Sequence, residues 1–217
     1  MESKERNVFV VKDKLIIIGA SGHGKVVADI AIKLNQWQDI VFLDDDKFKK
    51  RCMGLKIEGN VASAFTYTKN ADFFVAIGNN SIREEIQERL IFEKQSVISL
   101  IHPTAVIGSD VEIGYGTVVM AGVIINSSTT IGNGCVINTS SSIDHDNIIE
   151  NYVHISPGVR TAGNVSIGKS TWLGIGSVVS NNITIYKNSI IGAGTIVIKD
   201  IAESGTYIGI PSRRVKK

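Results

Sequence analysis

The chain has 217 residues, of which 43% are hydrophobic and 20% are charged, and its formal net charge is +2. This composition suits a globular protein with a substantial core, and so small a charge gives no support for nucleic-acid or membrane binding. The opening residues are charged, which predicts no signal peptide, and no apolar run approaches the roughly 18 residues of a membrane span. The two cysteines lie in different halves, which predicts no disulfide scaffold. We therefore expect a cytoplasmic protein.

The first 100 residues alternate buried strands with helical patterns. Strands are predicted at residues 14–18, 40–43 and 73–77. One helical pattern covers residues 26–34, and Ser81 is expected to cap a second helix. Strands that alternate with helices indicate a small Rossmann-like α/β domain with a parallel sheet. Residues 1–13 precede the first strand and receive no assignment.

A glycine-rich turn follows the first predicted strand and contains Gly19, Ser21, Gly22, His23 and Gly24. Backbone N–H groups and the helix dipole converge at such a turn, which favours phosphate. A dinucleotide loop would have glycine at position 21, where this chain has serine. Past the second strand, Asp44 stands where a ribose contact is expected. We interpret these residues as a nucleotide or nucleotide-sugar site; a tight turn that requires small residues is the alternative.

From residue 101 onward the sequence follows a six-residue repeat. Between Ile101 and Val197, sixteen of the seventeen residues at this spacing are Ile, Val or Leu. A small or β-branched residue often follows four positions later, and we expect both kinds to point inward. Glycine follows the aliphatic residue at positions 108, 114, 132, 168, 174 and 192, where we expect the chain to turn a corner. Three repeats form one coil, so the pattern predicts five to six stacked coils of parallel β-helix. We expect the segment after Val197 to leave the helix and pack against it.

One histidine occupies a predicted corner of this β-helix. His145 lies two residues after the inward Ile143 and should therefore point outward. Acetyl transfer to an amine or hydroxyl requires a base, and imidazole suits this role at neutral pH. A carboxylate, Asp146 or Asp144, can hold its tautomer, and one coil further on Gly163 offers an N–H to a thioester oxygen. We expect His145 to be a general base; a hydrated corner histidine is the alternative.

Three other residues were considered for chemical roles. His154 is interpreted as binding the acceptor or lining the site; a histidine that only covers an outer face is the alternative. Cys135 occupies a small interior position and is expected to be a packed thiol, and His102 is expected to be structural. A metal-bound, hydratase-like β-helix that uses His102, His145 and His154 is an alternative from another class, but we expect no metal.

Several segments together resemble the NeuD/PglD-type family of sugar acetyltransferases. The resemblance covers nearly the whole chain and is carried by His154 and by residues 19–25, 43–45, 77–80, 138–146, 162–168 and 209–214. The expected fold is an α/β N-terminal Rossmann-like domain, residues 1–100, plus a C-terminal left-handed parallel β-helix of hexapeptide repeats with a cap, residues 101–217.

The resemblance also implies site residues. It implies a homotrimer with acetyl-CoA as cosubstrate between neighbouring β-helices, His145 and Asp146 as catalytic residues, and a cofactor site formed by His154, Gly163, Ile175 and Ala193. The nucleotide-linked sugar would be held by Gly19, Ser21, Gly22, His23, Gly24, Asp44, Asp45, Gly78, Asn79 and Asn138. Since the family often has Glu where this chain has Asp146, the choice between Asp144 and Asp146 as partner of His145 stays open here.

The predicted function is acetyl-CoA-dependent N-acetylation of the 4-amino group of a UDP- or GDP-linked amino-dideoxy sugar, by direct transfer. Such a product would serve bacterial surface glycan or glycoprotein sugar synthesis. O-acetylation of a sugar such as a sialic acid is the alternative. The sequence names neither the sugar nor the base.

Overall fold

A six-stranded sheet forms the centre of the first part of the chain. The computed structural model describes residues 12–67 and 70–215, and the strand order of this sheet is β3-β4-β2-β1-β5-β6. All its strand pairs are parallel except β3 with β4. The elements are β1 (Lys12–Ile18), α1 (Gly22–Leu34), β2 (Trp37–Leu43), β3 (Arg51–Cys52), β4 (Leu55–Gly59), the 3-10 helix η1 (Val61–Thr66), β5 (Asp72–Val75), α2 (Asn80–Phe92) and β6 (Ser96–Val97).

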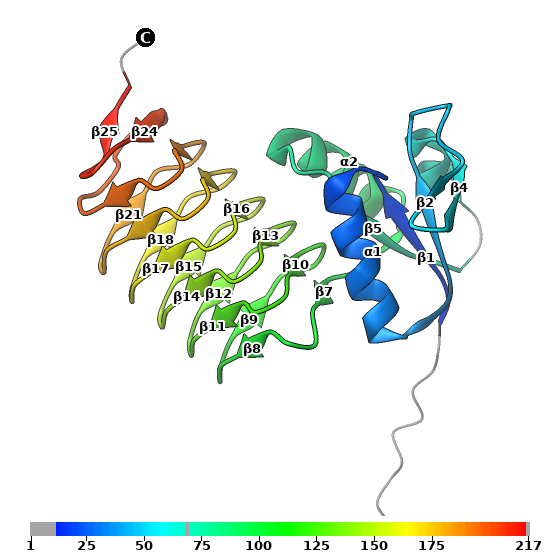
Figure 1. Cartoon of the computed structure of the whole chain (residues 1–217), viewed down its shortest axis with the longest axis horizontal. Coiled ribbons are helices and arrows are strands. Elements are labelled where there is room, and N and C mark those ends of the chain that lie inside the picture. The colour runs from blue at the N-terminus through cyan, green and yellow to red at the C-terminus, as the bar shows by residue number, and fades with distance from the viewer. Residues whose placement is uncertain (1–11, 68–69, 216–217) are drawn as a thin grey trace, which may run out of the picture.

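The central strand β1 is buried on both faces, which explains its unbroken apolar sequence. Leu15 and Ile17 belong to the core that includes Ile30 of α1, whereas Ile16 and Ile18 pack in the core that includes Leu90 of α2. A parallel strand covered on both sides needs apolar residues at every position rather than at alternate ones. The expected Rossmann-like α/β fold is therefore confirmed (Figure 1).

The cap of α2 differs from the prediction. Asn79 is the N-cap, and its side-chain oxygen accepts a hydrogen bond from the Ile82 N–H at 3.1 Å. Ser81 lies inside the first turn, so its expected capping role is wrong. Asn79 has the extended backbone that an N-cap requires, and an asparagine oxygen reaches the third helical N–H as well as a serine would.

The second part of the chain is a three-sided prism of two-residue strands, a left-handed parallel β-helix (Figure 1). Its first face contains β7 (Leu100–Ile101), β10 (Val118–Val119), β13 (Val136–Ile137), β16 (His154–Ile155), β19 (Trp172–Leu173) and β22 (Ile190–Ile191). The second face contains β8 (Val106–Ile107), β11 (Ile124–Ile125), β14 (Ser142–Ile143), β17 (Arg160–Thr161), β20 (Val178–Val179) and β23 (Ile196–Val197). The third face contains β9 (Glu112–Ile113), β12 (Thr130–Ile131), β15 (Ile148–Ile149), β18 (Ser166–Ile167) and β21 (Thr184–Ile185).

The coil register matches the repeat. Val119 pairs with Ile101 on one side and with Ile137 on the other, each one 18-residue coil away. The interior is closely filled: Ile143 and Cys135, an aliphatic and a small repeat position, are both fully buried. The prediction of stacked parallel coils is confirmed.

The residues that turn the corners are not the glycines that we expected. Every sixth residue from Asp110 to Gly194 has a left-handed backbone, three positions after the aliphatic residue rather than one. The glycines at 108, 114, 132, 168, 174 and 192 instead face a neighbouring coil. A Cβ on Gly132, for example, would lie 2.7 Å from the Asn151 backbone nitrogen. Close stacking of coils, not backbone conformation, therefore requires them.

The segment after Val197 does not leave the β-helix at once. Ile201 pairs in parallel with Ile185, and β24 (Thr206–Ile208) pairs in parallel with β22. These partners are 16 residues apart instead of 18, so the six-residue pattern stops although the coil continues. Only then does the chain reverse into β25 (Arg213–Arg214), antiparallel to β24.

Expectations for the two chain ends lie partly outside the described residues. The expected absence of a signal peptide rests on the charged residues 1–6, which lie outside the described part of the chain, and residues 216–217 lie outside it as well. Arg214 belongs to the cap, where its guanidinium pairs with Glu203. Within residues 12–67 and 70–215, no helix combines the length and apolarity that a membrane crossing requires.

Candidate active site

His145 lies on an outer edge of the prism, between β14 of the second face and β15 of the third. Its side chain is 57% exposed, and the Nδ1–H donates to Oδ2 of Asp146 at 2.7 Å. This bond leaves Nε2 as the basic nitrogen. The hydrogen bond to Asp146 raises the pKa of His145, and the negative charges of Asp144 and Asp146 add to this effect. The pair is thus arranged as a base with an orienting carboxylate.

The question of which carboxylate faces the imidazole is answered by the hydrogen bonds. Asp144 Oδ1 accepts from the His145 backbone N–H at 2.9 Å and from Asn126 Nδ2 at 2.8 Å. The bond from Asn126 lowers the pKa of Asp144 and keeps it ionised. Asp144 therefore holds the backbone of the corner, and Asp146 holds the ring.

Gly163 lies against the His145 ring, as the coil spacing predicted. The Asn164 N–H donates to the His145 carbonyl at 3.0 Å, which joins the two coils at this edge. A Cβ on Gly163 would lie 2.5 Å from Cε1 and 2.6 Å from Nε2 of His145. Within the described part of the chain, the Gly163 N–H donates no hydrogen bond. The position therefore combines space for the ring with an available backbone donor.

Asn147 supports this corner and was missed by the sequence analysis. It is fully buried at an interior repeat position, and its Nδ2 donates to the carbonyls of Asp144, His145 and Ala162 at 2.8, 3.1 and 2.9 Å. Its Oδ1 has no partner among the described residues. A large amide at a position that is elsewhere small or β-branched was the signal that could have revealed it.

The other predicted residues of the β-helix lie on different edges. Ile175 and Ala193 are exposed and stacked one coil apart between the first and second faces, and Asn138 lies on the same edge. His154 lies on the first face, so the whole third face separates it from His145. His102 is buried beside Thr104. The three histidines of the metal alternative thus do not meet, and no cluster of three His, Cys, Asp or Glu suited to a metal occurs in the described residues.

Cys135 is an interior thiol, as expected. It is fully buried, and burial raises its pKa to about 11. A thiol that stays protonated and sealed inside the prism cannot act as an acyl acceptor.

The predicted phosphate turn is built as a strand–loop–helix junction. A Cβ on Gly24 would lie 2.0 Å from the Gly19 carbonyl oxygen, so the helix can approach the strand only without a side chain there. The Asp44 carboxylate fixes the loop, accepting from Ala20 N–H at 2.7 Å and from Asp46 N–H at 2.9 Å. The N–H groups of the first turn of α1, which begins at Gly22, have no partner within that helix.

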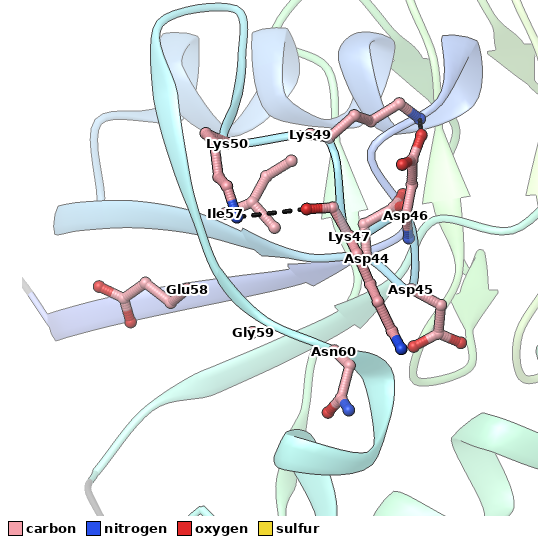
Figure 2. Close-up of a pocket in the computed structure, with 10 residues that line it drawn as sticks. All are labelled: Asp44, Asp45, Asp46, Lys47, Lys49, Lys50, Ile57, Glu58, Gly59 and Asn60. Atoms are coloured by element: carbon pink, nitrogen blue, oxygen red, sulfur yellow. Dashed lines mark hydrogen bonds and ion pairs between the residues drawn. The ribbon is translucent and has the colours of Figure 1, made fainter.

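A pocket of about 440 Å³ opens at the carboxyl end of β2 (Figure 2); Asp44 connects it to this turn, but no residue of the turn lines it. Asp44 and Asp45 line it, and Asp45 Oδ1 accepts from Val61 N–H at 2.9 Å; their contact with a nucleotide stays a prediction. The sequence analysis missed the lysines that share its lining, Lys47, Lys49 and Lys50. Their position directly after the acidic run was the available signal.

The remaining predicted residues meet where the two parts of the chain join. His154 Nδ1 lies 3.4 Å from the Gly78 carbonyl, and its ring stacks on Trp172 with centroids 5.6 Å apart. Burial, followed by the charges of His154 and Arg83, lowers the pKa of His23 to about 4. A pocket of about 460 Å³ lies here, lined by Gly78, Asn79, Asn80, Ser81, Ser170, Trp172, Asn188 and Ile190. The structure therefore groups His23 with His154 rather than with the lysine-lined pocket.

A hexapeptide-repeat prism with an outward histidine–carboxylate pair beside a backbone N–H is an acyltransferase architecture. Comparisons with known proteins specify it further. Residues 14–90 match the family model of the PglD N-terminal domain. The GDP-perosamine N-acetyltransferase of Escherichia coli O157:H7 is 30% identical over 169 residues, 75% of this chain and 76% of that protein. The chain therefore belongs to the PglD-type family of sugar N-acetyltransferases.

Two further relatives differ in how much of them is matched. The UDP-N-acetylbacillosamine N-acetyltransferase of Bacillus subtilis strain 168 is 39% identical over 109 residues, 48% of this chain, and the chain spans 50% of its length. The acetyltransferase domain of PglB from Neisseria gonorrhoeae FA1090, solved in complex with acetyl coenzyme A, is 35% identical with a TM-score of 0.91. That match covers 94% of this chain and 100% of the solved domain.

Proposed function

We propose that this protein transfers the acetyl group of acetyl-CoA to the 4-amino group of a nucleotide-linked amino-dideoxy sugar, in bacterial surface glycan or glycoprotein sugar synthesis. The observation that carries the proposal is the His145–Asp146 pair beside the unengaged N–H of Gly163, at an exposed edge. Its relatives include N-acetyltransferases named for UDP-linked and GDP-linked sugars, which supports this class of acceptor.

The residues suggest direct transfer with one base. His145 Nε2 accepts the proton that the attacking amine loses, while Asp146 stabilises the imidazolium. The Gly163 N–H donates to the carbonyl oxygen of the thioester as that oxygen gains negative charge. His145 then returns the proton to the leaving thiolate, so the products are an amide and CoA. No residue of the chain becomes acylated.

A homotrimer would complete the cosubstrate site. Within one chain, His145 and the pair Ile175 and Ala193 lie on different edges of the prism. The second face, which lies between those edges, carries exposed aliphatic side chains, with Val106 59% and Ile124 43% exposed. Packing of such faces between three chains would bury these side chains and bring His145 of one chain towards Ile175 of the next. Light scattering of the purified protein tests this: a monomer at assay concentration would refute it.

The N-terminal residues are suited to the nucleotide. The first turn of α1, with Ser21, Gly22 and Gly24, offers N–H groups to the diphosphate. Asp45 has an oxygen left for a ribose or base. Three lysines share its pocket with four carboxylates, and Lys49 pairs with Asp46. We place the reaction in the cytoplasm, where acetyl-CoA and nucleotide sugars are both available.

The test is an acceptor panel with the purified protein. Acetyl-CoA is supplied with UDP- and GDP-linked 4-amino sugars and, separately, with sialic acids, and free thiol and product mass are measured. Thiol release with an amino-sugar nucleotide, and a mass gain on its nitrogen, is expected. Release with sialic acid alone would establish the O-acetylation alternative instead.

A further inference from the structure

One fully buried arginine joins the two parts of the chain. Arg83 of α2 donates from Nε to the Gly134 carbonyl at 2.7 Å and from Nη2 to the Tyr152 carbonyl at 3.2 Å. On its own side, it donates from Nη1 to the carbonyls of Ile77 and Gly78 at 2.9 and 3.2 Å, and from Nη2 to Asn80 Oδ1 at 2.9 Å. One guanidinium thus ties the loop at residues 77–80 to two successive coils.

Among the described residues, the hydrogen-bond partners of this cation include no carboxylate. The nearby Glu84 pairs with Lys169 instead. Burial lowers the pKa of Arg83 to about 10, which reflects the cost of holding a cation away from water. A buried cation is a costly way to join two surfaces, which apolar side chains would join at least as well. What a guanidinium supplies and an apolar contact cannot is a planar set of donors with fixed directions.

Arg83 is linked to His154 through one shared acceptor, the carbonyl oxygen of Gly78. The Gly78 carbonyl accepts from Arg83 and lies 3.4 Å from His154 Nδ1, so it also orients that imidazole. Trp172 stacks on the ring, and its own Nε1 donates to Ser156 Oγ at 2.7 Å. Burial, followed by the charge of Arg83, lowers the pKa of His154 to about 4, so the ring is neutral at physiological pH.

The same clamp sets the width of the junction pocket. Residues 78–81 form one wall, and Trp172 and its neighbours on the prism form the other. Asn80 reinforces the clamp from its Nδ2, which donates to the Ser170 carbonyl at 3.0 Å. We propose that Arg83 is a positioning residue that holds the 77–80 loop on the prism, fixes the imidazole of His154 and keeps the bound sugar in register with the transfer site. This role rests on the proposed function.

The test compares Arg83→Lys, which keeps the positive charge but loses the planar set of donors, with Arg83→Met, which loses both. Since a displacement of about 1 Å can cost about 100-fold in rate, we expect kcat to fall about 100-fold in both variants. The Kd of the free nucleoside diphosphate should stay within about 2-fold, because it does not depend on the register of the two parts. In NMR titrations without substrate, the pKa of His154 should rise from about 4 towards its ordinary value of 6.5, as water enters the loosened loop.

Gln87→Met is the matched control. Gln87 lies one turn further along α2, is fully buried and donates to the Tyr115 carbonyl at 3.3 Å, but among the described residues it makes no side-chain hydrogen bond to the 77–80 loop. Its replacement should lower the Tm and leave kcat and the His154 titration unchanged. An unchanged kcat in both Arg83 variants would overturn the proposal, as would a fall in kcat with an unaltered His154 titration. If Arg83→Met does not fold, Arg83→Lys carries both readouts. The titration needs no acceptor, so it remains decisive even if the proposed acetyl transfer is wrong.

Discussion

Replacing Gly163 with alanine separates catalysis from stability at the His145 edge. The added Cβ would lie 2.5 Å from Cε1 of His145, whereas carbon atoms in contact are about 3.5 Å apart or more. The imidazole must therefore move by about 1 Å, which should lower kcat about 100-fold. Gly163 is not among the left-handed residues, and the ring that it displaces is 57% exposed and can swing aside. The Tm should therefore stay within about 2 °C of the wild type.

Steady-state thiol release measures kcat, and calorimetry measures the Tm. His145→Ala provides the control background, because without the ring the new methyl group has nothing to displace. Gly163→Ala should then change the residual rate little. Full kcat in the single variant would refute the assigned geometry. A further large loss in the His145→Ala background would show that the methyl group acts on the oxyanion donor instead.

Three further predictions concern the same edge and its coils. The rate should fall as pH drops through the raised pKa of His145, because protonation removes the base; Asp146→Asn should move this acidic limb of the pH–rate profile to lower pH and reduce the maximal rate. An unshifted limb would contradict the pairing with Asp146. Asn147→Val removes three hydrogen bonds to backbone carbonyls, so it should lower the free energy of unfolding in denaturant by about 1–3 kcal/mol and should also lower kcat; unchanged unfolding would contradict this supporting role. Gly132→Ala brings a Cβ to 2.7 Å from the Asn151 nitrogen and should lower the Tm without changing the pH–rate profile; an unaltered Tm would contradict the stacking role.

Much of the prism could be predicted because each repeat obeys the same local rule. The interior positions, the coil length and the stacking of His145 against Gly163 all follow from counting residues. Counting failed where the rule changed, as in the shortened coil that pairs Ile185 with Ile201. The prediction of the corner residues was also wrong. The glycines that are visible in the pattern are required by coil stacking, whereas the residue with the left-handed backbone can be Asp, Ser, Asn or Tyr.

The contacts between the two parts could not be read in the same way. Arg83 lies in a helix with many charged neighbours, where an arginine normally faces solvent, and nothing local marks it as fully buried. Its acceptors are backbone carbonyls of distant coils, and every residue type has such a carbonyl, so the sequence does not identify them. The choice between Asp144 and Asp146 was likewise a matter of side-chain direction, which adjacent positions in the sequence do not reveal.

The groups that accept hydrogen bonds at this junction are backbone carbonyls that repeat along the prism, so they do not depend on residue type. The carbonyls of Gly134, Tyr152 and Ser170 occupy equivalent positions on three successive coils, and Arg83 and Asn80 bind them. Every coil has an equivalent carbonyl, about 4.8 Å from the carbonyl of the preceding coil. The position along the prism is therefore selected by side chains, through the Tyr152 hydroxyl on Glu88 and the ion pair of Lys169 with Glu84. His145 lies between residues 134 and 152, and Gly163 lies between residues 152 and 170, so the first part of the chain is fastened to the same coils that carry this edge.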